Sequence, residues 1–310
     1  MMKKIFLFCL SLVAILILVS GCSKEQAPHT KTTKTITYNS QKYTVPATPE
    51  RIVTLSNSLL KILYAVDGTA IGRVESSEQL SENMEKLPTV GHTATVNMET
   101  LVGLNPDLVI GLKTQHEKFI SQLESNKLPN ILIDYDGIND NVPLIKFIGQ
   151  LTNHEEKAAV IIKDYESKIN TLKKKAATHT PAKVAVLRAT GKAVTAETSK
   201  SITASMVKDL GMNNVILNHK NLTEDSKTVP YSLESLAQDN PDIIFVVTMG
   251  KAEDINKTMT KEMTSNPAWN QLSAVKNNKV FYLPSNLFLL NPGLQTPEAM
   301  EILLNYAYGN

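Results

Sequence analysis

The chain has 310 residues, with 32 lysines and arginines against 30 aspartates and glutamates, and this near balance gives no support for a nucleic-acid partner. Its two cysteines, Cys9 and Cys22, both lie near the N-terminus, so the rest of the chain has no thiol for a disulfide bond, a metal site or a catalytic nucleophile. The length is large for a single hydrophobic core and favours two domains.

The N-terminal segment has the features of a secretory signal peptide. Two lysines precede an apolar run from Ile5 to Val19, which is shorter than the roughly 20 residues that a spanning helix needs. The run ends at Val19-Ser20-Gly21-Cys22, where small residues before a cysteine resemble the lipobox of bacterial lipoproteins. The resemblance implies that Cys22 carries lipid and holds the protein on the extracytoplasmic face of the cell membrane. An ordinary N-terminal membrane anchor is the alternative.

The first elements of the folded part are predicted from local patterns. The segment from Ser23 to about Lys34 has no apolar period and is expected to be a flexible tether. Residues from Ile36 to Val45 alternate around Asn39-Ser40, which is typical of a β-hairpin. The apolar run from Ile52 to Leu55 precedes Ser56-Asn57-Ser58, and this order predicts a strand that leads into a capped helix.

Short apolar runs separated by helical patterns recur along the remaining chain. They are Leu108–Ile110, Ile131–Ile133, Val184–Leu187, Ile243–Val247 and Val280–Leu283. Strands that alternate with helices predict an α/β fold with largely parallel sheets, buried on both faces.

A longer pattern interrupts this alternation between Glu155 and Ala176. Apolar residues recur there at steps of four and three, which places them on one side of a long helix. At about 1.5 Å per residue, such a helix spans roughly the width of a small domain, so we expect it to bridge two lobes. The expected organisation is a signal peptide at 1–21, a lipidated tether at 22–34, an N-terminal lobe at 35–152, a bridging helix at 153–180 and a C-terminal lobe at 181–310.

The chain also contains an internal repeat. Met98–Ile110 matches Leu233–Phe245 position for position, and each segment predicts a helix that ends at Asn-Pro-Asp before a strand. A reused helix-to-strand turn explains the proline and the aspartate. It explains Glu99 and Glu234, one in the first turn of each helix, less well, although a carboxylate there gains from the helix dipole.

Together these features resemble the solute-binding lipoproteins of bacterial ABC importers for iron complexes and cobalamin. The resemblance covers about Thr35 to Tyr308, and the further motifs that carry it are Pro49–Val53, Asn266–Trp269 and Ala274–Phe281. It implies two Rossmann-like lobes joined by one long helix, with the ligand in a cleft between them, in a monomeric binding protein and not an enzyme. It also implies that Glu99 and Glu234 dock on the membrane permease, where one carboxylate per lobe suits a symmetric permease dimer.

Within that family the likeness is greatest to the haem-binding lipoproteins of Gram-positive surface haem-uptake systems. Those proteins hold the iron between a methionine of an N-lobe loop and a histidine after a C-lobe strand. The matching positions here carry Ala94 and Met249, but His92 lies two residues before Ala94 in the same loop. A swapped pair of His92 and Met249 would preserve His/Met ligation of haem iron, which is a known axial combination. Each could instead be an ordinary surface or packing residue.

Two further residues are candidates for contact with the ligand. Arg188 follows a buried strand and could pair with a haem propionate at the carboxyl end of the sheet. Tyr231 could supply an oxygen ligand or a stacking surface, or be a partly buried loop aromatic. The other histidines lack metal-ligand spacing, and we expect them in the tether, in loops or on exposed helix faces. They are His29, His116, His154, His179 and His219.

The sequence leaves other functions open. A ferric siderophore is the alternative cargo, but anionic siderophores are usually gripped by arginines, and the chain has only Arg51, Arg73 and Arg188. Cobalamin binding would leave no ionic signature. An extracytoplasmic α/β enzyme is a distant alternative, because the chain has no nucleophile elbow, His-Glu-x-x-His motif or phosphate-binding glycine loop. The repeated glutamate argues weakly against a purely structural or adhesive lipoprotein.

Overall fold

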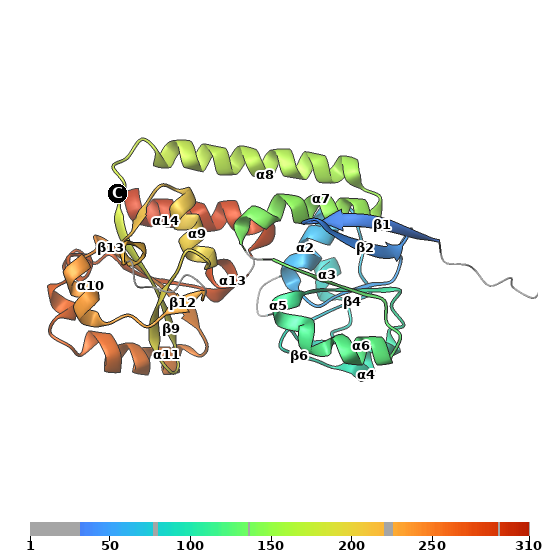
Figure 1. Ribbon diagram of the computed structural model, residues 1–310, viewed down its shortest axis with the longest axis horizontal. Helices are drawn as coiled ribbons and strands as arrows, with labels where there is room; N and C mark the ends of the chain where they lie inside the picture. The colour runs from blue at the N-terminus through green and yellow to red at the C-terminus, as the bar shows by residue number, and fades with distance from the viewer. Residues whose placement is uncertain (1–31, 77–79, 136, 220–225, 291, 310) are drawn as a thin grey trace, which may run out of the picture. The chain divides into compact units, whose positions relative to one another are not determined.

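The computed structural model describes residues 32–76, 80–135, 137–219, 226–290 and 292–309. Thr33–Asn310 forms one compact unit, which contains two main sheets (Figure 1). The chain therefore has the α/β architecture expected from its alternating strands and helices. In the part of the chain that the structure describes, no helix is long and apolar enough to cross a membrane.

The first sheet has four parallel strands in the order β4-β3-β7-β8. They are β3 (Ile52–Thr54), β4 (Gly72–Arg73), β7 (Leu108–Leu112) and β8 (Asn130–Ile133). Every residue of β3 and β7 is buried, which explains why both strands are continuous apolar runs. The helices of this lobe are α2 (Asn57–Ala65), α3 (Glu82–Glu85), α4 (Met98–Gly103), α5 (Lys113–His116), η1 (Glu117–Phe119), α6 (Ile120–Ser125), η2 (Ile138–Asp140) and α7 (Asn141–Thr152).

The connection from β3 to α2 follows the predicted order of strand and helix. Ser56 occupies the N-cap position, but its side chain makes no bond to the helix backbone. Its hydroxyl lies 2.9 Å from the hydroxyl of Ser58 instead. The strand-to-helix prediction is confirmed, whereas the predicted side-chain cap is wrong.

Two hairpins accompany this sheet. Strand β1 (Thr33–Tyr38) pairs antiparallel with β2 (Gln41–Pro46), and the turn residues Asn39 and Ser40 have φ of 45° and 66°. The predicted hairpin is therefore confirmed. Its two tyrosines, Tyr38 and Tyr43, pack edge-on against Phe147 of α7 with ring centroids 5.5 and 5.6 Å apart. The second hairpin consists of β5 (Gly91–His92) and β6 (Thr95–Val96).

The second sheet has six strands and is mixed. Its main path is β12-β10-β9-β13-β14, and β11 also pairs with β9. The strands are β9 (Lys183–Thr190), β10 (Val194–Glu197), β11 (Asn213–Asn214), β12 (Thr228–Val229), β13 (Ile243–Met249) and β14 (Val280–Leu283). Strands β9, β11, β13 and β14 run parallel, as expected, but β10 and β12 add an antiparallel edge.

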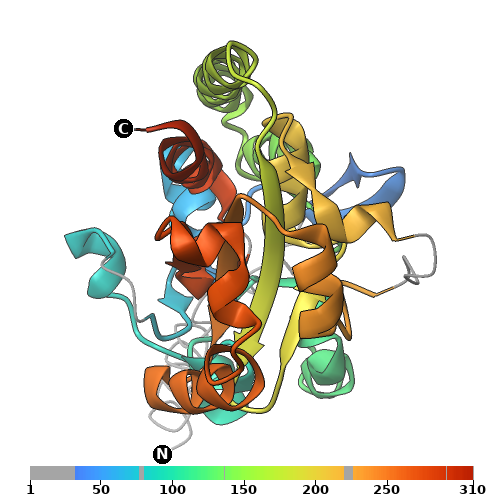
Figure 2. The ribbon, with the colours of Figure 1, turned by 90° about the vertical axis from the view of Figure 1, so that its left-hand side faces the viewer.

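Helices cover both faces of the second sheet, and Figure 2 shows them on either side of the long strand β9. One face packs against α9 (Ile202–Asp209), α13 (Ser285–Phe288) and α14 (Thr296–Tyr308). The other packs against α10 (Leu233–Asp239), α11 (Ala252–Met259) and α12 (Ser273–Lys276). The remaining elements are η3 (Val215–Asn218), the π-helical turn η4 (Thr260–Thr264), η5 (Trp269–Gln271) and η6 (Gly293–Gln295).

The long helix α8 runs from Glu155 to Ala176, which are the predicted bounds. Its first turn carries Glu155 and Glu156 and its last turn carries three lysines, an order that favours the helix dipole. It contacts α7 of the first lobe and α14 of the second (Figure 1). The two lobes are therefore bridged by this helix, as expected.

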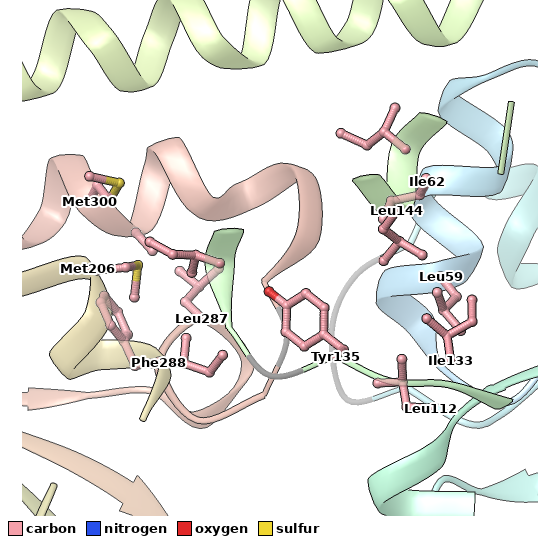
Figure 3. Packing of buried hydrophobic residues seen from close by; sticks show 14 of the residues in the cluster. Leu59, Ile62, Leu112, Ile133, Tyr135, Leu144, Met206, Leu287, Phe288 and Met300 are labelled. Carbon is pink, nitrogen blue, oxygen red and sulfur yellow. The ribbon is translucent and has the colours of Figure 1, made fainter. Parts of the chain in front are cut away.

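A buried amide also connects the lobes. Asn141, at the start of α7, donates from Nδ2 to Tyr165 Oη of α8 and to Thr296 Oγ1 of α14, both at 2.8 Å. Its Oδ1 accepts from Tyr135 Oη at 3.2 Å, and Figure 3 shows Tyr135 between the labelled apolar groups of the two lobes. A buried amide that loses its partners costs about 1–3 kcal/mol, so these bonds help to keep the lobes together.

Candidate functional site

The hairpin β5-β6 carries His92 in the N-terminal lobe. His92 pairs with Thr95 across the hairpin, and Gly91 has φ of 90°. A Cβ on Gly91 would lie 2.6 Å from the Thr95 carbonyl oxygen, so the tight turn requires glycine there. Three hydrogen bonds hold the hairpin: Glu75 N donates to Gly91 O, Asn97 N to Val90 O and Lys118 Nζ to Ala94 O. The hairpin is therefore a firm platform for the histidine.

The imidazole of His92 is exposed and faces a carboxylate. Its side chain is 68% exposed, and Nδ1 lies 3.3 Å from Glu75 Oε2. A carboxylate beside one ring nitrogen orients the imidazole and leaves the other nitrogen facing away from it. This arrangement can present Nε2 to an iron atom.

Met249 is the last residue of β13 in the C-terminal lobe. It pairs with Thr190, the last residue of β9, and is followed by Gly250 with φ of 119°. The Met249 side chain is 51% exposed, although methionine is usually a buried packing residue. Its thioether is therefore accessible, at the strand end where ligands commonly bind in α/β sheets.

Arg188 lies on β9, two residues before its end, and is bonded to a carboxylate that the sequence analysis missed. Its Nε and Nη2 lie 2.9 and 2.7 Å from Glu197 Oε1 of β10. The Arg188 side chain is 16% exposed and that of Glu197 is 0% exposed. Burial raises the pKa of the Glu197 carboxyl, and the guanidinium opposes that rise. The pairing of β10 with β9 brings these residues together, and no local motif signals it.

Tyr231 lies beside α10 in a cluster with His219 and Asp239. Its hydroxyl donates to the Asp239 carboxylate and lies 3.1 Å from His219 Nε2. His219 Nε2 also lies 2.7 Å from Asp239 Oδ2. Burial, followed by the hydrogen bond and charge of Asp239, raises the pKa of Tyr231. The polar partners of its hydroxyl are thus two side chains of the same lobe.

The two repeated glutamates are exposed in the first turns of matching helices. Glu99 follows the N-cap of α4 by two residues, and Glu234 follows the N-cap of α10 by two residues. Buried leucines anchor both helices, since Leu101 and Leu236 are each 0% exposed. Each lobe therefore presents one outward carboxylate on a short, anchored helix.

His116 corrects the expectation that the remaining histidines are exposed or lie in loops. It ends α5 and is 0% exposed, with Nδ1 2.9 Å from the backbone nitrogen of Leu112. Burial lowers its pKa, against the opposing effect of nearby backbone groups. An apolar period could not have revealed this burial, because the segment after β7 is short and polar.

Two further kinds of site were considered, a cluster of metal ligands and the lipid attachment residue. Among the described residues, no group of three or more histidines, cysteines, aspartates and glutamates could hold a metal ion. His92 therefore belongs to no such group. Cys22, the expected lipid attachment residue, lies outside the described residues.

A cavity of about 520 Å³ lies between α8 and α14, away from these strand ends. It is lined by Lys168, Leu172, Leu294, Glu298 and Glu301, among others. None of the candidate ligand residues lines it.

Comparison with known proteins shows what the chain is similar to. The putative ABC transporter substrate-binding lipoprotein YhfQ of Bacillus subtilis is 25% identical over 96% of both chains. The Fe(3+)-citrate-binding protein YfmC of the same organism is 26% identical, over 96% of this chain and 94% of its own. The crystal structure of Staphylococcus aureus IsdE complexed with heme superposes with a TM-score of 0.72 at 25% identity, covering 83% of this chain and 98% of IsdE.

The periplasmic binding protein family matches residues 52–287, which include both sheets' parallel strands and the bridging helix. The match also agrees with the expectation of a binding protein instead of an enzyme. The chain belongs to the periplasmic binding protein family.

Proposed function

We propose that this protein is the substrate-binding lipoprotein of an ABC importer and that it captures haem for delivery to a membrane permease. The observation that carries the proposal is that each lobe offers one exposed iron-ligating side chain at a strand or hairpin end, His92 at 68% and Met249 at 51% exposure. The similarity to the heme-binding IsdE supports the same ligand.

The chemistry of the two side chains fits haem iron. His92 Nε2 would be the stronger ligand, because Glu75 orients the ring through Nδ1. Met249 would supply a weak thioether on the opposite face of the macrocycle. Arg188, which is paired with Glu197, would lie near the edge of the macrocycle and make no bond to the metal. Tyr231 has a smaller part in this proposal, because its hydroxyl is already bonded to Asp239.

Delivery would use the matching carboxylates and the lipid anchor. Glu99 and Glu234 would dock on cationic side chains of the two permease subunits, one from each lobe. Cys22 would carry lipid at the extracytoplasmic face of the membrane, which is consistent with the lipoprotein YhfQ. The protein would act as a monomer.

A spectroscopic titration tests the ligand. Haemin is added to purified protein that begins at Ser23 and contains the whole described unit, and the visible spectrum is recorded. The wild type should give a low-spin complex, and both His92→Ala and Met249→Leu should shift it toward a five-coordinate form. His92→Ala should have the larger effect, because imidazole is the stronger ligand of ferric iron. Met249→Leu preserves the apolar volume and removes the sulfur alone.

The matched control is His179→Ala, which removes an exposed histidine that stacks on Tyr308 at 4.4 Å. This variant should retain the wild-type spectrum. No Soret change with haemin in the wild type, or an unchanged spectrum in His92→Ala, would contradict the haem assignment.

A ferric siderophore is the second candidate cargo. The observation that favours it is the similarity to YfmC, an Fe(3+)-citrate-binding protein, at the same level of identity as to the heme binders. Titration of the same samples with ferric siderophores and with cobalamin separates these ligands from haem.

A further inference from the structure

Every arginine of the chain has its guanidinium bonded within the protein. The chain has three arginines, all among the described residues. Arg51 donates to the carbonyl oxygens of Asn105 and Leu104 at 2.9 and 2.6 Å. Arg73 donates to three carbonyl oxygens, at 2.9 to 3.2 Å. Arg188 is bonded to Glu197, so each of the three guanidinium groups already donates hydrogen bonds within the protein. None is therefore free to bind an anionic ligand through two parallel hydrogen bonds without losing a bond of its own.

Arg188 differs from the other two because its partner is charged. Two of its nitrogens share Oε1 of Glu197, whose side chain is wholly buried. Water and salt screen such a carboxylate little, so it neutralises the guanidinium effectively. The pair lies next to the carboxyl end of β9, which is a common ligand position in α/β sheets.

The lysines at the strand ends are weaker substitutes for an arginine. Lys113, directly after β7, lies 3.5 Å from Asp134, which follows β8. Lys192 and Lys251, on the turns after β9 and β13, are exposed. An exposed lysine offers a strongly hydrated point charge and no planar fork of donors. Its attraction for an anion is also screened by salt.

We propose that Glu197 determines ligand specificity: by neutralising Arg188 it favours iron complexes of low net charge, such as haem or a neutral ferric tris-hydroxamate, over trianionic ones such as a ferric tris-catecholate. This inference rests on the proposed function, because it requires that Arg188 faces the ligand. The buried carboxylate lowers the affinity for trianionic complexes, because a trianion gains no electrostatic attraction from a guanidinium whose charge is neutralised.

The test compares a neutral ferric tris-hydroxamate with a trianionic ferric tris-catecholate of similar size. Binding to the full-length protein in detergent is measured by calorimetry at low and high salt. The wild type should bind the neutral complex more tightly. Glu197→Gln keeps the shape of the side chain but removes its charge, so it should gain on the order of tenfold in affinity for the tris-catecholate. That gain should shrink at high salt, and affinity for the tris-hydroxamate should hardly change.

Glu262→Gln is the matched control. Glu262 also belongs to the C-terminal lobe, and its Oε2 accepts from Val194 N at 2.7 Å, a bond that glutamine can preserve. This control removes one negative charge without touching the Arg188 pair, so it should give a much smaller gain. The double variant Arg188→Gln/Glu197→Gln should lose the gain, because the freed guanidinium is absent.

Tighter binding of the tris-catecholate by the wild type, or no gain in Glu197→Gln, overturns the inference. If neither chelate binds the wild type, new tris-catecholate binding in Glu197→Gln supports it and continued absence of binding overturns it. If circular dichroism shows that Glu197→Gln does not fold, the double variant is compared with the wild type instead. The inference is then overturned if the double variant prefers the tris-catecholate. A parallel haemin titration tests the proposed function, so the two failures are distinguishable.

Discussion

Helices α4 and α10, one in each lobe, have matching N-caps and a glutamate at the same position of the first turn. Each N-cap side chain, Asn97 or Ser232, accepts a hydrogen bond at 3.1 Å from the backbone nitrogen three residues later. Each helix is followed by an asparagine with positive φ: Asn240, with φ of 41°, caps α10, and Asn105, with φ of 47°, lies just after Leu104, the C-cap of α4. Glu99 and Glu234, in the first turns, therefore occupy equivalent positions relative to the N-caps of the two helices.

A basic residue at the start of one parallel strand in each lobe makes equivalent contacts: Arg51 directly precedes β3, and Lys183 is the first residue of β9. Asp107 N donates to Arg51 O at 3.1 Å, and Asp242 N donates to Lys183 O at 2.8 Å. The side chains of Arg51 and Lys183 each donate to carbonyl oxygens at the end of the adjacent helix. Cations at helix C-termini are favourable, so the repeat stabilises both helices by the same physics.

The segments that carry the proposed ligand residues differ between the lobes. His92 stands on a hairpin held by three hydrogen bonds, whereas Met249 ends a strand and is followed by a glycine with φ of 119°. We expect equivalence where the lobes meet a two-fold symmetric permease, and divergence where they meet the two faces of one ligand. The comparison teaches that the repeated helices share one local construction, whereas the segments that carry His92 and Met249 do not.

Removing both repeated glutamates should have the largest effect. Glu99→Ala combined with Glu234→Ala should abolish uptake of the iron complex by cells, because each lobe would lose its docking charge. Ligand affinity of the purified variant should stay near the wild-type value. Uptake of labelled iron and calorimetry measure the two effects, with Glu166→Ala/Glu301→Ala as a control that removes two other exposed carboxylates. Loss of ligand affinity in the double variant would place these residues in the ligand site instead.

Truncating the buried leucine of each helix tests whether the two helices are anchored equally. Leu101→Ala and Leu236→Ala should each lower the free energy of unfolding by about 2–5 kcal/mol, because both leucines are fully buried. Urea denaturation followed by circular dichroism measures the loss. Similar values would show that the two helices are anchored equally. A cost below about 1 kcal/mol for one of them would contradict the equivalence of the repeat.

Most of the fold was predictable because its signals are local or periodic. The hairpin around Asn39 and Ser40, the bounds of Glu155–Ala176 and the repeat were all predicted from short segments, and all three are present in the structure. The antiparallel edge strands β10 and β12 were missed, because they are short and gain their stability from pairing with neighbouring strands, which their own sequence pattern does not show.

The candidate site was less predictable, because its decisive contacts join residues of different elements. The partner of Arg188 comes from the next strand, nine residues away, and that of His92 comes from the loop after β4. Tyr231 was considered as a ligand, but its hydroxyl meets Asp239 at the other end of α10. Such pairings follow from the packing of elements, which residue spacing alone does not encode.

The buried His116 gives the N-terminal lobe a pH dependence. Burial lowers its pKa in the native state, while an unfolded chain has a histidine pKa of about 6.5. As the pH falls below about 6.5, the unfolded state therefore binds a proton that the native state does not, and the free energy of unfolding decreases by up to about 1.4 kcal/mol per pH unit. Urea denaturation at pH 7.5 and 5.5 should show a smaller decrease for His116→Gln. The exposed-site control His179→Gln should retain the wild-type pH dependence; an unchanged dependence in His116→Gln would contradict the prediction.

The smallest expected effects concern the two N-caps. Asn97→Ala and Ser232→Ala each remove one hydrogen bond to a helix backbone nitrogen, and each should cost about 1 kcal/mol of unfolding free energy. Because the helices are short, local loss of order should accompany this cost and reach the glutamate two residues away. Hydrogen exchange of the Thr100 and Ser235 amides should therefore accelerate in the respective variants. Replacement by aspartate, which also accepts at an N-cap, should preserve both the stability and the slow exchange. Equal acceleration in the alanine and aspartate variants would show that the cap does not hold these helices, and the shared frame of Glu99 and Glu234 would then depend on the buried leucines alone.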